Sequence, residues 1–150
     1  SEINSNALET TEVGLINLSN GESSVELHGY DGNGSLVATV DFNMAGSGRV
    51  NQRVDQLFGA QDARQIRWIQ VNATNKMEGY TRVGSRDGKE RYAVSGSKRL
   101  SSRLFVPHIA EGVNQWFTRA TVVNGGSDEA NASIQTPTDS RSLLLNEGFS

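Results

Sequence analysis

Histidine and serine side chains are the first groups in this 150-residue chain to consider for chemistry. His28 and His108 are its two histidines, and they do not have the short spacings that metal-binding histidine pairs use. Two serine-glycine clusters, at residues 46–48 and 95–97, lack the strand-turn-helix context that exposes a nucleophilic serine. We therefore predict no catalytic residue, no metal site and no cofactor.

The loop after Tyr30 has oxygen-bearing side chains at the spacing of a calcium-binding loop. Asp31, Asn33 and Ser35 stand at loop positions 1, 3 and 5, but Leu36 replaces the required glycine and Phe42 replaces the bidentate acid. The Asp-Gly-Asn-Gly sequence of residues 31–34 is typical of a hairpin turn, because Asn and Gly tolerate positive backbone angles. We predict a turn here and no calcium.

Charge is distributed unevenly along the chain. Residues 1–62 carry two basic and nine acidic side chains. Residues 63–103 carry ten basic and three acidic side chains, and residues 104–150 carry two basic and five acidic side chains. The middle part, here called the basic block, suits an anionic partner such as an acidic polysaccharide. Alternatively, its strands pair with acidic strands of the same fold, at about 0.2–1 kcal/mol per cross-strand pair. Nucleic acid is not expected, because the pI is near 5.4 and the block has few aromatic residues.

Aromatic side chains within the basic block are candidates for stacking on sugar rings. Tyr80 and Tyr92 both lie among its basic residues. The alternative is that most aromatic residues form the core, since they make up only 7% of the chain. The candidate ligand-binding residues are Tyr80, Arg82, Arg86, Lys89, Arg91 and Tyr92.

Apolar and polar residues alternate in many short segments between glycine-rich turns. In residues 36–42, the alternation predicts Leu36, Ala38, Val40 and Phe42 on one face of a strand. Within residues 49–60 we expect a strand followed by a short helical turn around Val54–Phe58. In the next segment we expect Ile66 and Trp68 in the core. About ten strands with minimal helix predict an all-β antiparallel sandwich, Ig-like or jelly-roll-like. Besides the strand expected within residues 49–60, the expected strands cover residues 13–18, 22–30, 36–42, 65–73, 76–84, 90–96, 101–109, 116–124, 129–136 and 142–145.

Bulk composition limits the remaining possibilities. The chain has no cysteine, which excludes disulfides, thiolate metal sites and cysteine nucleophiles. No apolar run approaches the roughly 18 residues that a membrane-spanning helix needs, so we predict no membrane insertion.

A sequence pattern recurs at a distance of 107 residues. Its common form is a threonine, an apolar stretch, an asparagine, a small polar turn, a glutamate and then alternating apolar residues. A recurrence of this length predicts one small domain per repeat. The recurring residues are Thr11, Ile16, Asn17, Glu22, Val25 and Leu27, which align with Thr118, Val123, Asn124, Glu129, Ala132 and Ile134.

The second copy of this pattern follows residues 104–110 (LFVPHIA), Trp116 and Thr118. Together with residues 66–84 (IRWIQVNATNKMEGYTRVG), these motifs resemble a repeated module of secreted bacterial surface proteins. The resemblance covers most of residues 11–134 and implies a secreted or cell-surface location, or a periplasmic one, with no catalytic residues to carry over. The chain departs from the module before Thr11, where the Pro-His motif and the tryptophan are missing.

These observations predict the domain organisation and three possible functions. We expect a flexible arm over residues 1–10 and a sandwich over residues 11–150, with residues 104–150 either folding back into it or starting a second repeat. The expected function is a non-enzymatic spacer or adhesion module, whose partners are neighbouring modules or other surface proteins. The first alternative is a carbohydrate-binding module for an acidic polysaccharide. The second is a hydrolase fragment, since a carboxylate pair for glycoside hydrolysis depends on separation in space.

Overall fold

The computed structural model describes residues 9–85, 91–96, 122–124, 126, 128–135 and 140–145. It divides into two compact units, one running to Gly96 and the other from Ser97 to Phe149, and each is described by itself. Several predictions lie outside the described residues: most of the arm, the turn at residues 86–88, His108 and the strand at residues 101–109. Glu9 and Thr10, predicted in the arm, begin the first strand.

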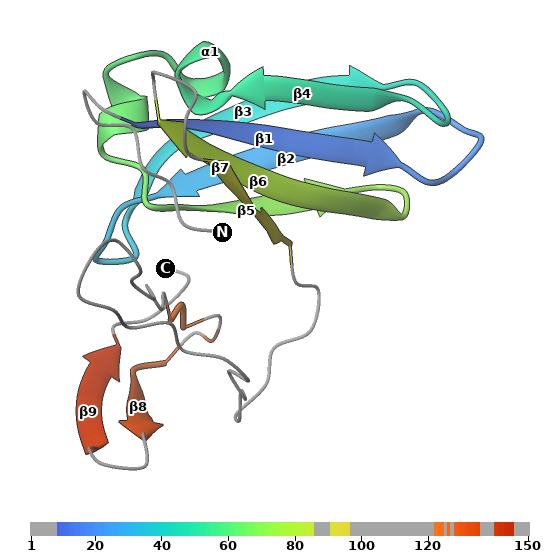
Figure 1. Ribbon diagram of the computed structural model, residues 1–150. Coiled ribbons are helices and arrows are strands. Elements are labelled where there is room, and N and C mark those ends of the chain that lie inside the picture. Colours follow the sequence, from blue (N-terminus) through green and yellow to red (C-terminus); the bar gives the residue numbers. More distant parts are fainter. Residues whose placement is uncertain are drawn as a thin grey trace. The chain divides into compact units, whose positions relative to one another are not determined.

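Seven strands of the N-terminal unit form two antiparallel sheets that lie one over the other (Figure 1). The predicted all-β antiparallel sandwich is confirmed. One sheet has the order β4-β1-β6-β7 and is here called sheet A; the other has the order β3-β2-β5 and is called sheet B. Sheet A contains β1 (Glu9–Asn17), β4 (Arg49–Arg53), β6 (Met77–Ser85) and β7 (Arg91–Ser95); sheet B contains β2 (Ser23–Tyr30), β3 (Leu36–Met44) and β5 (Trp68–Ala73).

The core fills the space between the two sheets because the strands alternate. Val13 and Leu15 of β1 and Val25 and Leu27 of β2 are buried in one cluster. Glu12, which precedes Val13, and Glu26, which lies between Val25 and Leu27, are on the outer faces, as a period of two requires. Each sheet therefore has one apolar inner face and one polar outer face.

A short helical segment connects the two sheets at one end of the sandwich (Figure 1). It consists of α1 (Val54–Phe58) and a 3₁₀ turn, η1 (Asp62–Arg64), which lie between β4 of sheet A and β5 of sheet B. Val54 and Phe58 are one helical turn apart and both are buried in the core. The predicted strand followed by a turn around Val54–Phe58 is confirmed.

Two predicted core residues are on the outside. Leu36 is 50% exposed because the pairing of β2 with β3 shifts between Gly29 and Tyr30, so that Val37 packs against the core in its place. Trp68 pairs with Tyr30 on the outer face of sheet B, because Ile66, which is buried, precedes the strand rather than belonging to it. Both predictions assumed an uninterrupted alternation.

The C-terminal unit contains one described hairpin, made of β8 (Ala130–Gln135) and β9 (Ser140–Leu145). The two strands pair in antiparallel register from Ala130 with Leu145 to Gln135 with Ser140. Both strands were predicted. The prediction of a strand over residues 116–124 is wrong for the three of these residues that the structure describes, because Val122–Asn124 are not in a strand.

Candidate functional site

The candidate residues that the structure describes lie on β6 and β7, and they divide between the two faces of sheet A. Tyr80 and Arg82 are two residues apart on the outer face. Tyr92 pairs with Val83, whose side chain is buried in the core. Because paired residues lie on the same face of a sheet, Tyr92 is on the inner face of sheet A, on its edge strand β7. The structure therefore brings Tyr80 and Arg82 together and separates them from Tyr92. The side chain of Arg91 and all of Arg86 and Lys89 lie outside the described residues.

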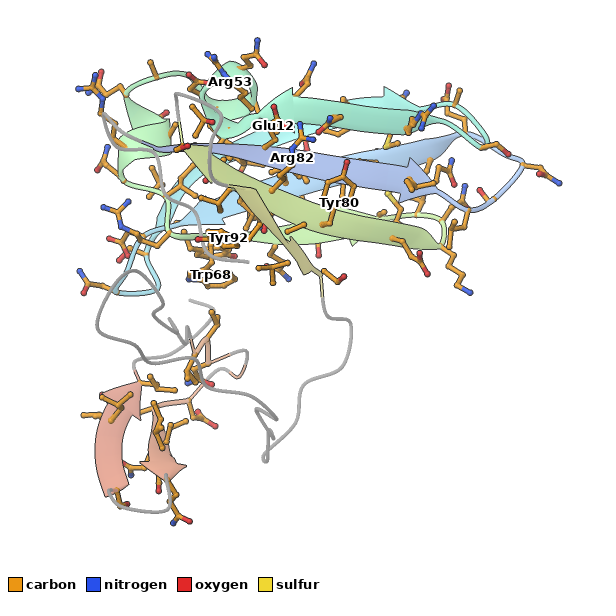
Figure 2. The ribbon with its side chains drawn as sticks, viewed as in Figure 1. Glu12, Arg53, Trp68, Tyr80, Arg82 and Tyr92 are labelled. Carbon is orange, nitrogen blue, oxygen red and sulfur yellow. The ribbon has the colours of Figure 1, made fainter. Side chains whose placement is uncertain are left out.

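Arg82 forms an ion pair with an acidic residue of the neighbouring strand. Glu12 of β1 stands in register between Arg53 of β4 and Arg82 of β6, and its carboxylate contacts the Arg82 guanidinium (Figure 2). The Arg53 guanidinium in turn donates to both carboxylate oxygens of Asp55, at 2.9 and 2.8 Å. Two arginines of the outer face are thus paired with acidic residues from the N-terminal part of the chain.

Tyr80 lies against a glycine of the neighbouring strand. It stands directly opposite Gly14, and a Cβ atom built at Gly14 would overlap the Tyr80 ring. The ring therefore occupies the space that the missing side chain leaves on β1. Tyr80 and Arg82 share the outer face of sheet A, and the Arg82 guanidinium is paired with Glu12.

The outer face of sheet B carries a second polar arrangement, here called the Tyr30 network. The Tyr30 hydroxyl donates to Gln70 Oε1 at 3.1 Å and lies 3.4 Å from His28 Nδ1. His28 Nε2 lies 2.9 Å from Glu26 Oε2, and Asn72 Nδ2 donates to the same oxygen at 3.1 Å. The Tyr30 ring also stacks on Trp68, with ring centroids 4.2 Å apart. Five polar side chains of β2 and β5 thus form one connected chain.

The environment of this network shifts two pKa values. Hydrogen bonds from Asn72 and then from His28 hold the pKa of Glu26 below its usual value of 4.5. Burial, followed by the negative charge of Glu26, raises the pKa of Tyr30 above its usual value of 10.0. At neutral pH, Glu26 is therefore an anion that accepts hydrogen bonds and Tyr30 is a neutral donor.

Sequence analysis predicted neither the Tyr30 network nor the role of Trp68 in it. The alternation in residues 22–30 placed Glu26 and His28 on a polar face, and this was the available signal. The partners Gln70 and Asn72 depend on the register of β2 with β5, and these strands are some 40 residues apart in the sequence. Alternation alone does not determine that register.

The buried side chain of Asn17 holds the turn between β1 and β2. Its Oδ1 accepts from the backbone nitrogen of Ser19 at 3.0 Å and from the Ser19 hydroxyl at 2.7 Å. Its Nδ2 donates to the carbonyl oxygen of Gly21 at 2.9 Å and to those of Ala45 and Met44 at 3.1 and 3.4 Å. One amide thus connects the β1–β2 turn to the end of β3.

Asn124 makes two local hydrogen bonds with the same sequence spacing in the C-terminal unit. Its Oδ1 accepts from the backbone nitrogen of Gly126 at 3.0 Å, and its Nδ2 donates to the carbonyl oxygen of Asp128 at 2.6 Å. The partners are two and four residues further along, as Ser19 and Gly21 are from Asn17. The recurrence at 107 residues therefore coincides with a recurring hydrogen-bond pattern.

Among the described residues, no group of three or more histidine, cysteine, aspartate or glutamate side chains is placed to hold a metal ion. No helix in the described part of the chain is long and apolar enough to span a membrane. Comparisons of the chain with protein-family models, with curated proteins and with solved structures found no match.

Proposed function

We propose that this chain is a non-enzymatic structural or interaction module, a spacer or adhesion unit of a bacterial secreted or cell-surface protein. Its partners are neighbouring modules of the same kind or other surface proteins. The bacterial and extracytoplasmic context comes from the resemblance of residues 104–124 and 66–84 to repeated surface modules.

The observation that carries the proposal is the turn that occurs twice. Asn17 and Asn124 are 107 residues apart, and each accepts from residue i+2 and donates to residue i+4. Each turn leads into a strand six residues after the asparagine, at Ser23 and Ala130. A domain-sized unit that is repeated in one chain is the usual construction of proteins that extend or present a binding surface.

The pairing of charges supports a structural role for the part of the basic block that the structure describes. Arg82 contacts Glu12, and Glu26 is held by His28 and Asn72. The pairs Arg82 with Glu12 and Asn72 with Glu26 join neighbouring strands on the outer faces, where cross-strand pairs contribute about 0.2–1 kcal/mol each. The charges therefore help to fix strand register.

A carbohydrate-binding module for an acidic polysaccharide is the second candidate, and one observation favours it. Tyr80 lies against Gly14 on the same outer face as Arg82, so an aromatic ring and a guanidinium that is paired with Glu12 lie within one sheet. Tyr92 is on the opposite face, so a glycan bound at Tyr80 would not reach it across the sheet.

Glycan binding by the whole chain distinguishes the two candidates. The chain is applied to a panel of neutral and acidic polysaccharides at two salt concentrations, and the release of reducing ends is measured in the same samples. A spacer or adhesion module that recognises proteins is expected to show no retention and no release. Retention by an acidic glycan that weakens with salt would replace this proposal with the carbohydrate-binding one, and release of reducing ends would contradict both.

Two matched variants locate the site if retention is seen. Tyr80→Ala removes the aromatic surface beside Arg82, whereas Tyr92→Ala removes a tyrosine from the opposite face of the same sheet. Loss of retention in Tyr80→Ala alone would assign the glycan to the outer face. Equal loss in both variants would indicate a general effect on the fold, which the melting temperature of each variant would reveal.

A further inference from the structure

The acceptor sequence for N-linked glycans occurs four times in this chain. It consists of an asparagine, any residue except proline, and then serine or threonine. The chain carries this sequence at Asn17, Asn33, Asn72 and Asn131, and all four asparagines lie in the part that the structure describes. An acceptor also has to be within reach of an enzyme, so the surroundings of each asparagine decide which of them can be modified.

Two of the four side-chain amides are already held by the fold. Asn17 is 1% exposed, and its Nδ2 donates to the carbonyl oxygens of Gly21 and Ala45. Asn72 is exposed on β5, but its Nδ2 donates to Glu26 Oε2 at 3.1 Å. Because N-glycosylation joins the sugar to this same nitrogen, modification of either residue would disturb contacts that the fold uses.

Asn131 is exposed, but it lies inside a paired strand. It belongs to β8, and its partner on β9 is Leu144. Exposed loop tips are where proteases reach a folded chain most readily, and N-linked acceptors are found in surface loops. The strand pairing therefore makes Asn131 a poorer acceptor than an asparagine in a turn.

Asn33 is in the turn between β2 and β3, the loop whose spacing of oxygen-bearing side chains resembles a calcium site. Asn33 and Ser35 are both exposed. Asp31 Oδ1 accepts from the backbone nitrogens of Asn33 and Ser35, at 2.8 and 3.0 Å, so one oxygen holds both residues of the acceptor sequence. Within the described part of the chain, the Asn33 side-chain amide has no hydrogen-bond partner. Its nitrogen is therefore available for modification.

Asp31 also supplies a charge next to the acceptor. A carboxylate stands two residues before Asn33 and, as Glu129, two residues before Asn131, but not before the other two acceptors. An arginine of an enzyme can bind a carboxylate through two parallel hydrogen bonds, which fixes the position of the asparagine beside it. Of the four acceptors, Asn33 thus combines an exposed turn, an available amide and a carboxylate.

We propose that Asn33 is the acceptor of an N-linked oligosaccharide, and that Asp31 is the carboxylate through which an oligosaccharyltransferase recognises it. The donor is an oligosaccharide attached to a polyprenyl pyrophosphate. Asn33 Nδ2 forms a bond to the anomeric carbon of the first sugar, while the bond from that carbon to the pyrophosphate oxygen breaks. Polyprenyl pyrophosphate leaves with the electron pair of this bond, and the amide nitrogen loses one proton. The inference rests on the extracytoplasmic location in the proposed function, because N-linked acceptors are used in secreted proteins.

Transfer with purified components tests the proposal. The folded full chain is incubated with a bacterial oligosaccharyltransferase and its lipid-linked oligosaccharide, and the occupancy of each of the four acceptors is measured by mass spectrometry. A peptide that accepts the same oligosaccharide shows that the enzyme is active. Asn33 is expected to be the most occupied of the four acceptors. No transfer to Asn33, or greater occupancy at any other acceptor, would overturn the proposal.

Two variants of the turn separate the acceptor from its recognition. Asn33→Gln keeps an amide but moves it by one methylene group, and it is expected to abolish the modification of this turn. Asp31→Asn removes the charge, while its side-chain oxygen can still accept the two backbone hydrogen bonds of the turn. This variant is expected to lower the occupancy of Asn33 several-fold with an unchanged melting temperature.

Glu129→Gln is the matched control for the carboxylate. It removes the charge before Asn131, leaves the turn at Asn33 as it is, and is expected to leave the occupancy of Asn33 unchanged. Full occupancy of Asn33 in Asp31→Asn would contradict recognition through Asp31. An equal loss at Asn33 in Asp31→Asn and Glu129→Gln would contradict it as well, because the effect would then not depend on the neighbouring charge.

The outcome for this modification and the outcome for the proposed function can be told apart. The glycan panel uses the chain without an attached oligosaccharide and measures retention, whereas the transfer experiment measures a covalent bond at Asn33. A failure of transfer with an active enzyme would overturn the acceptor and leave the spacer or adhesion function in place. Retention by an acidic glycan would replace that function and leave Asn33 as an acceptor.

Discussion

At the scale of single residues, Asn17 is a buried polar side chain that holds the β1–β2 turn to the end of β3. It is 1% exposed and satisfies one backbone nitrogen, one hydroxyl and three carbonyl groups. Asn17→Ala is expected to lower the free energy of unfolding by about 2–4 kcal/mol, because buried partners left without a hydrogen bond cost about 1–3 kcal/mol each. Urea denaturation measures this change. Asn20→Ala, on the exposed part of the same turn, is the control, and an equal effect of both would contradict the assigned role.

The carboxylate of Glu26 gives a prediction about pH. Its pKa lies below 4.5 because Asn72 and His28 stabilise the anion, so Asn72→Ala should raise that pKa toward its usual value. A pKa that is lower in the folded than in the unfolded state stabilises the fold above the unfolded value. This stabilisation is lost as the pH falls through the folded value.

Carbon-detected NMR titration of the Glu26 carboxyl group measures this pKa in the unchanged chain and in the variant. Thr39→Ala serves as the control, because Thr39 is exposed on the neighbouring strand of the same sheet, opposite His28. A Glu26 pKa that stays the same in Asn72→Ala would show that the amide is not the main cause of the shift.

At the scale of elements, the pairing of β1 with β6 depends on the fit of Tyr80 over Gly14. A methyl group at position 14 would overlap the ring, so Gly14→Ala is expected to lower the free energy of unfolding by about 1–3 kcal/mol, as overpacking does. In a Tyr80→Ala background the same substitution should cost much less, because the ring is gone. Gly21→Ala, where a Cβ meets nothing, is the control for a general effect of replacing glycine. Additive losses in the double variant would exclude the contact.

Elements that depend on interactions between residues close in the sequence could be predicted, and those that depend on residues far apart in the sequence could not. β2 and the turn at Val54–Phe58 were predicted because alternation and helical spacing are local properties. Tyr80 and Tyr92 were predicted as one site, yet the hairpin register pairs Tyr92 with Val83 and places the two rings on opposite faces. That register depends on the geometry of the connection between β6 and β7. The residue pattern of either strand is compatible with Tyr92 on the face of Tyr80 or on the opposite face. The partners of the Tyr30 network depend in the same way on pairing between distant strands.

At the scale of the whole molecule, the two alternatives for residues 104–150 predict different stabilities after truncation. Among the residues that the structure describes, the buried core cluster runs from Val13 to Ile66, together with partly buried neighbours up to Met77. If residues 104–150 begin a second repeat, a chain ending at residue 103 should melt cooperatively within about 4 °C of the full chain, the shift that about 1 kcal/mol would cause in a domain of this size. Differential scanning calorimetry measures both chains.

A fold-back of the C-terminal residues into the first sandwich would give the opposite result. Tyr92 and Val94 of β7 and Val71 of β5 belong to the inner-facing sets of their sheets and are 38–46% exposed. A strand from residues 104–150 that covered them would remove apolar surface from water, and its deletion would lower the melting temperature of the first unit. Asn17→Ala introduced into the truncated chain provides the control for a native-like core, because it should destabilise that chain as much as the full one. A large decrease on truncation would therefore assign residues 104–150 to the first module and contradict the second repeat.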